Sequence, residues 1–208
     1  MPTPTFDLYL VTDRAQTGGR DPLAVLEQAL AGGVKAVQLR EKDLSGKALF
    51  ELAEKTRRLC DRYQASLLIN DRIDVALAVD AAGVQITGVS LPVDVARNLL
   101  GPKKLLGAST HSLEEARQAQ NDGADFILFG PIYFTPSKAA FGAPKGLQTL
   151  KKILANVSLP VYAIGGIKAE HIAELRSLGI RGVALISAII GAADPKEAAA
   201  SLLRLLER

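Results

Sequence analysis

Side chains with hydrogen-bond donors alternate where one apolar run of this sequence ends. Gln38, Arg40 and Lys42 stand at every second position across the end of the run that closes at Leu39. In an extended chain, alternate side chains point to the same side. Arginine presents a planar fork of donors and lysine a compact charge, and this combination suits a diphosphate. The spacing therefore predicts a site for an anionic ligand, while Glu41 faces the other way or forms a structural salt bridge.

A neutral amide and a carboxylate follow the next apolar run. Asn70 and Asp71 come directly after residues 67–69. One carboxylate that shares the ion with substrate phosphates is a common arrangement for Mg²⁺. The pair therefore predicts a magnesium ligand at Asp71. The alternative is that Asp71 pairs with the adjacent Arg72 and is only structural.

Small residues follow two apolar runs near the end of the chain. Gly165 and Gly166 come after residues 161–163, and Ser187 follows the run that ends at Ile186. Glycine lets the backbone approach an anion closely, and backbone N–H groups bind phosphate. These positions predict a phosphate-binding cup. A tight turn alone would also explain the two glycines.

The segment at residues 130–146 is longer than most loops without secondary structure, which indicates a lid or a binding loop. It carries Thr135, Pro136, Ser137 and Lys138. Two hydroxyl groups and a cation could close over phosphate oxygens. A solvated, proline-rich surface loop is the other interpretation.

The two histidines differ in their settings. His111 lies one residue before Ser112, at the end of an apolar run, where it could exchange protons near neutral pH or only hydrogen-bond within the loop. His171 lies between polar neighbours in a helical pattern, near Lys168 and Glu170, so we expect it to be solvated.

The spacing of the apolar runs predicts the fold. Short runs rich in Val, Ile and Leu alternate with amphipathic helical stretches, a pattern typical of a parallel sheet covered by helices. Asp21 before Pro22, and Ser112 three residues before Glu115, mark helix starts. A doubly wound open sheet is the alternative, but no GxGxxG follows the first run. We therefore expect residues 1–208 to form a single (β/α)8 TIM-barrel domain. The expected strands are 6–11, 34–39, 66–69, 83–86, 104–108, 125–129, 160–163 and 182–186.

Composition excludes several other classes. The net charge is only +3 over 208 residues, and no basic run with interleaved aromatic residues indicates nucleic-acid binding. No apolar stretch reaches the roughly 20 residues that span a bilayer, and residues 1–4 do not resemble a signal peptide. Cys60 is the only cysteine, so we expect a buried structural thiol rather than a disulfide. These features predict a cytoplasmic protein without a membrane partner. Phosphate-binding barrels often self-associate, and the sequence leaves a homo-oligomer open.

In six segments along nearly the whole chain, the sequence resembles the thiamin phosphate synthase superfamily, which also contains the thiazole tautomerases. The motifs are specific in combination and in this order. They are Leu10-Val11-Thr12-Asp13, Gln38-Leu39-Arg40-Glu41-Lys42-Asp43, Ile69-Asn70-Asp71-Arg72, Gly130-Pro131-Ile132 with Thr135-Pro136-Ser137-Lys138, Ala163-Ile164-Gly165-Gly166-Ile167, and Ile186-Ser187-Ala188-Ile189.

The resemblance implies a synthase that joins a hydroxymethylpyrimidine diphosphate to a thiazole phosphate. Diphosphate leaves with Mg²⁺ assistance, and the thiazole nitrogen captures the pyrimidine methylene cation. Five positions match residues that hold the pyrimidine diphosphate: Gln38, Arg40, Lys42, Asn70 and Lys138. Ser109 matches a residue beside the pyrimidine, and Asp71 matches a Mg²⁺ ligand. The thiazole-phosphate cradle is matched by Thr135, Pro136, Ser137, Gly166, Ile186 and Ser187.

One segment departs from the synthase pattern. There the synthase reads His-x-Gly-Gln-x-Asp-Leu-Pro, and the Asp is a second Mg²⁺ ligand. Aligned on Gly83-Val84 and Leu91-Pro92, residues 85–90 read Gln-Ile-Thr-Gly-Val-Ser, so the neutral Ser90 takes the place of the acid. The metal would keep Asp71, diphosphate oxygens and water, and Ser90 could cap a helix that begins near Pro92.

This departure resembles the thiazole tautomerase branch, which needs no metal. That branch isomerises a thiazole carboxylate phosphate, with a histidine matching His111 as acid and base. Many synthases also carry this histidine, so His111 does not separate the two. Arg40, Lys42, Asp71 and Lys138 form an intact diphosphate set, which favours the synthase.

Two further classes remain open. A phosphosugar isomerase or lyase would share the cup but would need a pair of acid/base carboxylates or a Schiff-base lysine at a strand end, and neither stands out. A non-catalytic protein that binds thiamin precursors would explain Ser90. Tight binding without turnover at saturating Mg²⁺ would identify that class.

Overall fold

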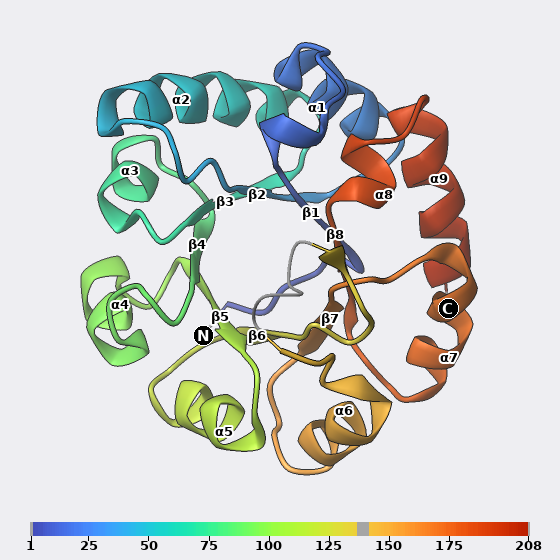
Figure 1. Ribbon diagram of the computed structural model, residues 1–208. Helices are drawn as coiled ribbons and strands as arrows, with labels where there is room; N and C mark the ends of the chain where they lie inside the picture. Colours follow the sequence, from blue (N-terminus) through green and yellow to red (C-terminus); the bar gives the residue numbers. More distant parts are fainter. Residues whose placement is uncertain (1, 137–141, 208) are drawn as a thin grey trace.

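Eight parallel strands form a closed barrel, and helices surround it (Figure 1). The computed structural model describes residues 2–136 and 142–207. The strands are β1 (Leu8–Val11), β2 (Ala36–Leu39), β3 (Ser66–Asn70), β4 (Gly83–Ile86), β5 (Leu105–Thr110), β6 (Phe126–Phe129), β7 (Val161–Ile164) and β8 (Gly182–Leu185). The α-helices are α1 (Pro22–Ala31), α2 (Gly46–Arg62), α3 (Ile73–Ala78), α4 (Val93–Leu100), α5 (Leu113–Asn121), α6 (Gly146–Leu154), α7 (Ala169–Ser177), α8 (Ser187–Ile190) and α9 (Pro195–Leu206). A short 3₁₀ helix, η1 (Arg14–Gln16), follows β1.

Each strand pairs in parallel with the next, and β8 pairs with β1. Tyr9 of β1 lies opposite Ala36 of β2 on one side and Ala184 of β8 on the other. This last pairing closes the sheet, which confirms the predicted (β/α)8 barrel and excludes the doubly wound open sheet. Every predicted strand is present, with ends that differ by no more than two residues.

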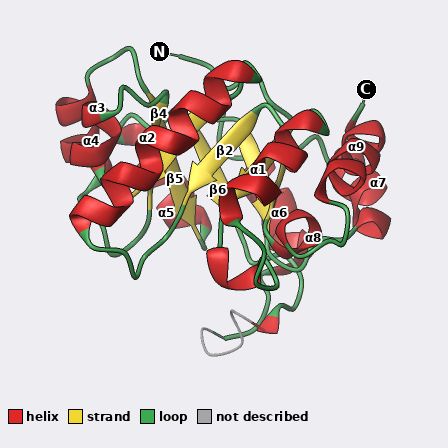
Figure 2. Ribbon diagram, turned by 90° about the horizontal axis from the view of Figure 1, so that it is seen from above, coloured by secondary structure: helices red, strands yellow, loops and turns green. Residues whose placement is uncertain are grey.

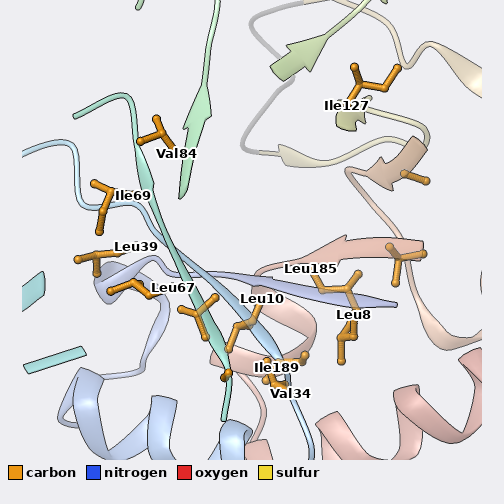
Figure 3. Close-up of a cluster of buried hydrophobic side chains, with 14 of the residues drawn as sticks. Leu8, Leu10, Val34, Leu39, Leu67, Ile69, Val84, Ile127, Leu185 and Ile189 are labelled. Carbon is orange, nitrogen blue, oxygen red and sulfur yellow. The ribbon is translucent and has the colours of Figure 1, made fainter. Parts of the chain in front are cut away.

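Successive residues of each strand face two different packing layers. One set points outward and packs under the helices, as Figure 3 shows for Leu10, Leu39, Ile69 and Leu185. The other set points into the barrel, where side chains of β1, β2, β3, β6, β7 and β8 form a second cluster. Because both faces are covered, each strand reads as a nearly continuous apolar run. In Figure 2 the strands accordingly lie between helices on either side.

Aromatic rings fill the barrel interior toward the amino ends of the strands. Phe6, Tyr9, Phe126 and Tyr162 contact one another with ring centroids 5.1–6.3 Å apart. The Tyr162 hydroxyl donates to the Phe6 carbonyl oxygen at 2.6 Å. Burial raises the pKa of Tyr9 above its ordinary value. This aromatic plug leaves the opposite, carboxyl end of the barrel for a ligand.

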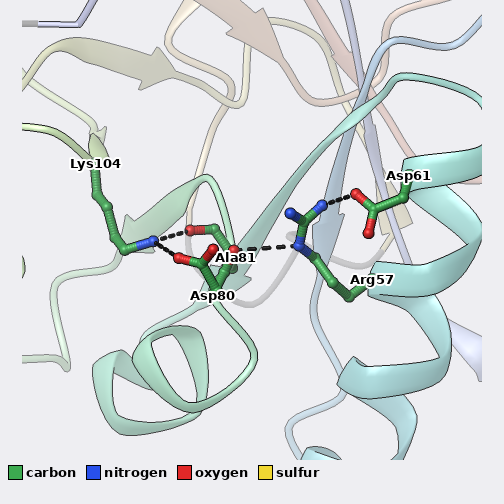
Figure 4. Close-up of polar contacts among 5 residues, drawn as sticks. All are labelled: Arg57, Asp61, Asp80, Ala81 and Lys104. Carbon is green, nitrogen blue, oxygen red and sulfur yellow. Dashed lines mark hydrogen bonds and ion pairs between the residues drawn. The ribbon is translucent and has the colours of Figure 1, made fainter.

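Ion pairs tie the segments at the amino end together (Figure 4). The Lys104 ammonium donates to an Asp80 carboxylate oxygen at 2.6 Å and to the Ala81 carbonyl oxygen at 2.7 Å. Arg57 donates to the Asp80 carbonyl oxygen at 3.2 Å and pairs with Asp61 one turn along α2. These charged groups pair with one another at the end of the barrel opposite the expected site, so we assign them a structural role.

Helix starts and the single cysteine follow the sequence predictions closely. Asp21 accepts from the N–H groups of Leu23 and Ala24, as an N-cap should.

The side chain of Cys60 is buried, and burial raises its pKa to about 12. In the described part of the chain, no helix combines the length and the apolar composition needed to cross a bilayer.

A buried ion pair generates the first prediction. Arg97 of α4 donates to a carboxylate oxygen of Asp125 at 2.6 Å, and the same oxygen accepts from the Leu106 N–H at 2.8 Å. The Asp125 side chain is completely buried. Removing one partner of such a pair leaves an uncompensated charge, so Asp125→Ala should lower the free energy of unfolding by about 3–5 kcal/mol.

Denaturant unfolding would measure this loss. The control is Asp122→Ala, which removes a carboxylate three positions earlier whose hydrogen bond to Gln118 is exposed, and it should change stability by no more than about 0.5 kcal/mol. Equal stabilities for the two variants would contradict the assignment of a structural role to the buried pair.

Candidate functional site

Polar side chains line one side of the barrel interior near the carboxyl ends of the strands. Gln38, Asn70 and Gln85 come from the neighbouring strands β2, β3 and β4, and Ser109 comes from β5. All three carboxamides are buried, and Gln85 is not exposed at all. The Gln38 Nε2, Asn70 Oδ1 and Gln85 Oε1 atoms are buried without a hydrogen-bond partner in residues 2–136 and 142–207. Buried polar atoms are normally paired, so this row of carboxamides offers donors and acceptors to a ligand.

Gln85 was not among the predicted site residues. Its Nε2 donates to the Ser109 hydroxyl at 3.1 Å, which fixes the predicted Ser109 from the neighbouring strand. The signal in the sequence was a carboxamide inside an otherwise apolar strand, at the position of the synthase histidine. A carboxamide occupies such an interior position at a cost unless something pairs with it.

Arg40 and Lys42 lie just beyond β2. The strand ends at Leu39, the predicted end, so Gln38 belongs to the strand and the two cations to the segment that follows it. Arg40 is half-buried and Lys42 lies exposed in the following turn. Within the described part of the chain, neither cation forms an ion pair or a side-chain hydrogen bond. Two cations without counter-charges are free to meet an anionic ligand.

A buried hydroxyl and a buried carboxylate shape this turn, and the hydroxyl was not among the predicted site residues. The Arg40 N–H donates to the Thr12 hydroxyl oxygen at 2.9 Å, and Thr12 donates in turn to Glu41 Oε1 at 2.7 Å. Glu41 Oε2 accepts from the Arg14 N–H at 3.2 Å. Glu41 therefore joins the turn to Thr12 and Arg14 after β1, and it forms no salt bridge with another described residue.

Asp71 is held by the end of the next strand. Asp71 Oδ1 accepts from the Thr87 N–H at 2.8 Å and from the Thr87 hydroxyl at 2.9 Å, and Oδ2 accepts from Asn70 Nδ2 at 2.8 Å. The Asp71 backbone has a φ of 59°, a left-handed conformation that an aspartate tolerates better than most residues. Arg72 pairs with Asp74 instead, so the alternative that Asp71 braces Arg72 is wrong.

Ser90 does not cap a helix. The N-cap of α4 is Pro92, without a side-chain hydrogen bond, and the Ser90 N–H closes a turn by donating to the Thr87 carbonyl oxygen at 3.0 Å. Among residues 2–136 and 142–207, no three His, Cys, Asp or Glu side chains gather in a metal-binding cluster. Asp71 is therefore not part of a preformed cluster of three ligating side chains among the described residues.

Backbone N–H groups without acceptors lie where β7 and β8 end. In the described chain, the N–H groups of Gly166, Ser187 and Ala188 donate to no protein oxygen. Ile186 immediately precedes Ser187 and packs against the inward-facing cluster. We call Gly165, Gly166, Ile186 and Ser187 the cup.

Backbone conformation and close packing also require glycine at the two glycine positions of the cup, apart from any anion. Gly165 and Gly166 have φ values of 96° and 67°, which favour glycine. A Cβ on Gly165 would lie 2.6 Å from Pro131, and one on Gly166 would lie 2.5 Å from the Phe134 carbonyl oxygen. The tight-turn interpretation is therefore correct in part, because the loop after β6 packs directly on these glycines.

The structure describes only part of the long loop after β6. Thr135 is half-buried and Pro136 is exposed. Ser137 and Lys138 lie outside the described residues. The stem of the loop is closed by hydrogen bonds from the Lys145 N–H to the Pro131 carbonyl oxygen at 2.8 Å and from the Gly146 N–H to the Ile132 carbonyl oxygen at 3.2 Å.

The two histidines have defined partners. His111 Nδ1 lies 3.0 Å from Glu115 Oε2, and the same oxygen accepts from the His111 N–H at 2.7 Å. Ser112 caps α5 by accepting from the Glu115 N–H, so the predicted capping box is modified, with Glu115 reaching His111 instead of Ser112. His171 is not simply solvated, as the sequence had suggested, because its ring stacks on Tyr133.

Cations, carboxamides and free N–H groups gather at the carboxyl end of the barrel, which we call the mouth. The fold and the mouth together define the class of the protein, because barrel enzymes have their active sites at this end. The family model described as thiamine monophosphate synthase matches residues 8–189. The chain belongs to this family.

Named relatives are similar in sequence to nearly the whole chain. The thiamine-phosphate synthase of Moorella thermoacetica is 46% identical over 205 residues, which cover 99% of this chain and 98% of that one. A Geobacter sulfurreducens protein that is provisionally named thiamine-phosphate synthase is 56% identical, over 97% of this chain and 94% of its own. The structure of a thiamine phosphate pyrophosphorylase from Pyrococcus furiosus matches with a TM-score of 0.87 and 38% identity, covering 96% of this chain and 95% of that one.

The Thr12 hydroxyl generates the second prediction. It joins the Arg40 N–H to the Glu41 carboxylate in a buried setting. Thr12→Val keeps the shape but leaves both groups without this partner, so it should lower the free energy of unfolding by about 1–3 kcal/mol. Thr12→Ser retains the hydroxyl and is the control in the same denaturant titration. A valine variant as stable as the serine variant would contradict this role.

Proposed function

We propose that this protein is a thiamin phosphate synthase, which joins a hydroxymethylpyrimidine diphosphate to a thiazole phosphate and releases diphosphate. One observation carries the proposal. Arg40 and Lys42 have no counter-charge within the described chain, and they follow β2, the strand that pairs with β3, after which Asp71 comes. Gln38, Asn70 and Gln85 each have one buried carboxamide atom that lacks a partner among the described residues. A phosphorylated ligand with a polar heterocycle fits both features. The family membership and the full-length relatives support the same reaction.

The interior of the mouth has two unlike sides, which suit two unlike substrates. On the side of β2 to β5, Gln38, Asn70 and Ser109 offer hydrogen bonds to the nitrogen atoms of a pyrimidine. On the side of β6 to β8, Leu128 and Ile164 belong to the apolar interior cluster. The less polar thiazole packs there, and its phosphate meets the cup together with Thr135, Pro136 and Ser137 of the loop.

The residues around Asp71 fit a magnesium ion that the diphosphate helps to hold. Asp71 supplies one carboxylate, and the buried Asn70 Oδ1 next to it lacks a hydrogen-bond partner. Mg²⁺ takes hard oxygen ligands and commonly keeps waters and substrate phosphates in its shell. When bound, the ion supplies positive charge to the oxygens of the departing diphosphate.

The protein's own part in the reaction is electrostatic positioning. Breaking the bond between the pyrimidine methylene and the diphosphate oxygen puts negative charge on the leaving group, which Arg40, Lys42 and Lys138 stabilise. Ser109, fixed by Gln85, holds the pyrimidine so that its methylene faces the thiazole nitrogen. The new carbon–nitrogen bond forms with the electron pair of that nitrogen, so no strong base is needed.

A coupled turnover assay tests the proposal. Purified protein is mixed with the pyrimidine diphosphate, the thiazole phosphate and Mg²⁺, and thiamin phosphate is measured with and without a chelator. We expect product that disappears with the chelator, which would also mean that Ser90 is a tolerated change. A folded protein that binds thiazole phosphate but makes no product would overturn the proposal.

A matched pair of lysine variants tests the diphosphate site. Lys42→Gln removes an unpaired cation of the site, whereas Lys47→Gln makes the same change on the exposed first turn of α2. A hydrogen bond to a charged group contributes about 1.5–3 kcal/mol, so Lys42→Gln should weaken inorganic diphosphate binding about ten- to a hundredfold. Isothermal titration calorimetry measures both variants. Equal affinities would remove Lys42 from the site.

One observation keeps thiazole tautomerase as a second candidate. His111 is half-exposed at the end of β5, and the Glu115 carboxylate orients its ring through Nδ1. A histidine held in this way presents its other nitrogen for proton transfer. Metal-independent conversion of the thiazole carboxylate phosphate, lost in His111→Asn, together with no thiamin phosphate synthesis, would favour this activity.

A further inference from the structure

Two rings stack between the long loop and the helix that follows the cup. The rings of Tyr133, in the stem of the loop after β6, and His171, in the first turn of α7, lie 3.8 Å apart between centroids with an interplanar angle of 18°. No other histidine–aromatic stack is recorded in the described part of the chain. Neither residue belongs to the predicted site, and the proposed reaction has not used them.

Both rings are fixed by further contacts. His171 Nδ1 accepts from the Lys168 N–H at 3.1 Å, so the ring closes the amino end of α7 as it stacks. The Tyr133 hydroxyl is buried and has no hydrogen-bond partner within the described chain, and burial together with the nearby Glu174 carboxylate raises the pKa of Tyr133. The tyrosine therefore keeps its proton, and its ring packs against the apolar core as well as on His171.

The backbones on either side of the stack are interlocked as well. The Tyr133 N–H donates to the Gly165 carbonyl oxygen at 3.0 Å, and the Ile132 N–H donates to the Ile164 carbonyl oxygen at 2.9 Å. Gly166 touches the Tyr133–Phe134 backbone so closely that a Cβ would not fit. Gly166 and His171 are therefore linked in two ways. The chain joins them over five positions, and a second link runs from His171 through the ring stack to Tyr133, whose backbone contacts Gly166.

We propose that Tyr133 and His171 are positioning residues that fix Thr135 of the loop relative to Gly166 of the cup, and so set the affinity for the phosphate of the thiazole substrate. Thr135 lies two residues beyond the stacked tyrosine, and Gly166 carries an N–H without an acceptor in the described chain. The two phosphate-binding segments belong to different β/α units, and the stack is a side-chain link between them. The inference rests on the proposed function, because it assigns the cup to the thiazole phosphate.

Four variants separate the ring from its hydrogen bond. His171→Gln keeps an acceptor for the Lys168 N–H, as glutamine does in a capping box, but loses the ring. His171→Phe keeps a ring but loses the acceptor. Tyr133→Leu removes the ring, and Tyr133→Phe removes only the hydroxyl. Thermal unfolding of all four checks that they fold.

The KM values of the two substrates give the decisive readout. His171→Gln and Tyr133→Leu should raise KM for thiazole phosphate about three- to tenfold, the range expected for one aromatic contact, with kcat and KM for the pyrimidine diphosphate unchanged. His171→Phe and Tyr133→Phe should keep the wild-type values. Equal losses for both substrates, or the same loss in the ring-preserving variants, would overturn the proposal.

Direct binding separates this inference from the proposed function. Calorimetric titration with thiazole phosphate alone requires no turnover. If the wild type makes no thiamin phosphate, but binding weakens only in the two variants without the ring, the proposed reaction fails and the positioning role stands. If all four variants bind like the wild type, or if the wild type does not bind thiazole phosphate, the positioning role is wrong.

Discussion

Hydrogen bonding between β8 and β1 closes the sheet, and this closure decides what each side chain of a strand can do. In a closed barrel, alternate residues point either under the helices or into a narrow interior. The interior is filled by Phe6, Tyr9, Phe126 and Tyr162 toward the amino ends. Only the last inward-facing position of each strand and the loop that follows it can therefore meet a ligand. Residues from distant parts of the chain meet at the mouth because the closed barrel exposes their inward-facing side chains only there.

The polar groups at the mouth of the barrel lower the stability of the folded state. Three buried carboxamide atoms and several N–H groups lack partners among the described residues, although a buried polar group without a hydrogen bond destabilises the folded state by about 1–3 kcal/mol. The outer layer offsets this cost, since side chains such as Leu67, Ile127 and Val183 are fully buried between strands and helices. The result is a rigid frame around unsatisfied donors and acceptors, which stand ready in place before a ligand arrives. Functional sites commonly depart from full hydrogen bonding in this way.

Most of the fold was predictable because each β/α unit is encoded locally. Apolar runs fixed the eight strands, and Asp21 fixed a helix start. The position of a candidate residue at the carboxyl end of the barrel was predictable where that residue ends or follows its own strand, as Asn70 and Arg40 do. The hydrogen bonds from Thr87 to Asp71 and from Thr12 to Glu41 join residues that are 16 and 29 positions apart in the sequence. No local sequence pattern specifies such pairs. His171 was misjudged for the same reason, because its stacking partner lies on another β/α unit.

Barrel enzymes commonly diversify by exchanging one loop at a time on a constant frame. The contact between Gly166 and the Phe134 carbonyl oxygen restricts that freedom here. A loop of different backbone path grafted after β6 would collide with the segment after β7 or leave a gap there, and a larger residue at Gly165 would displace Pro131. For protein engineering and for divergence within the family, these two loops form one module that has to be inherited or redesigned together.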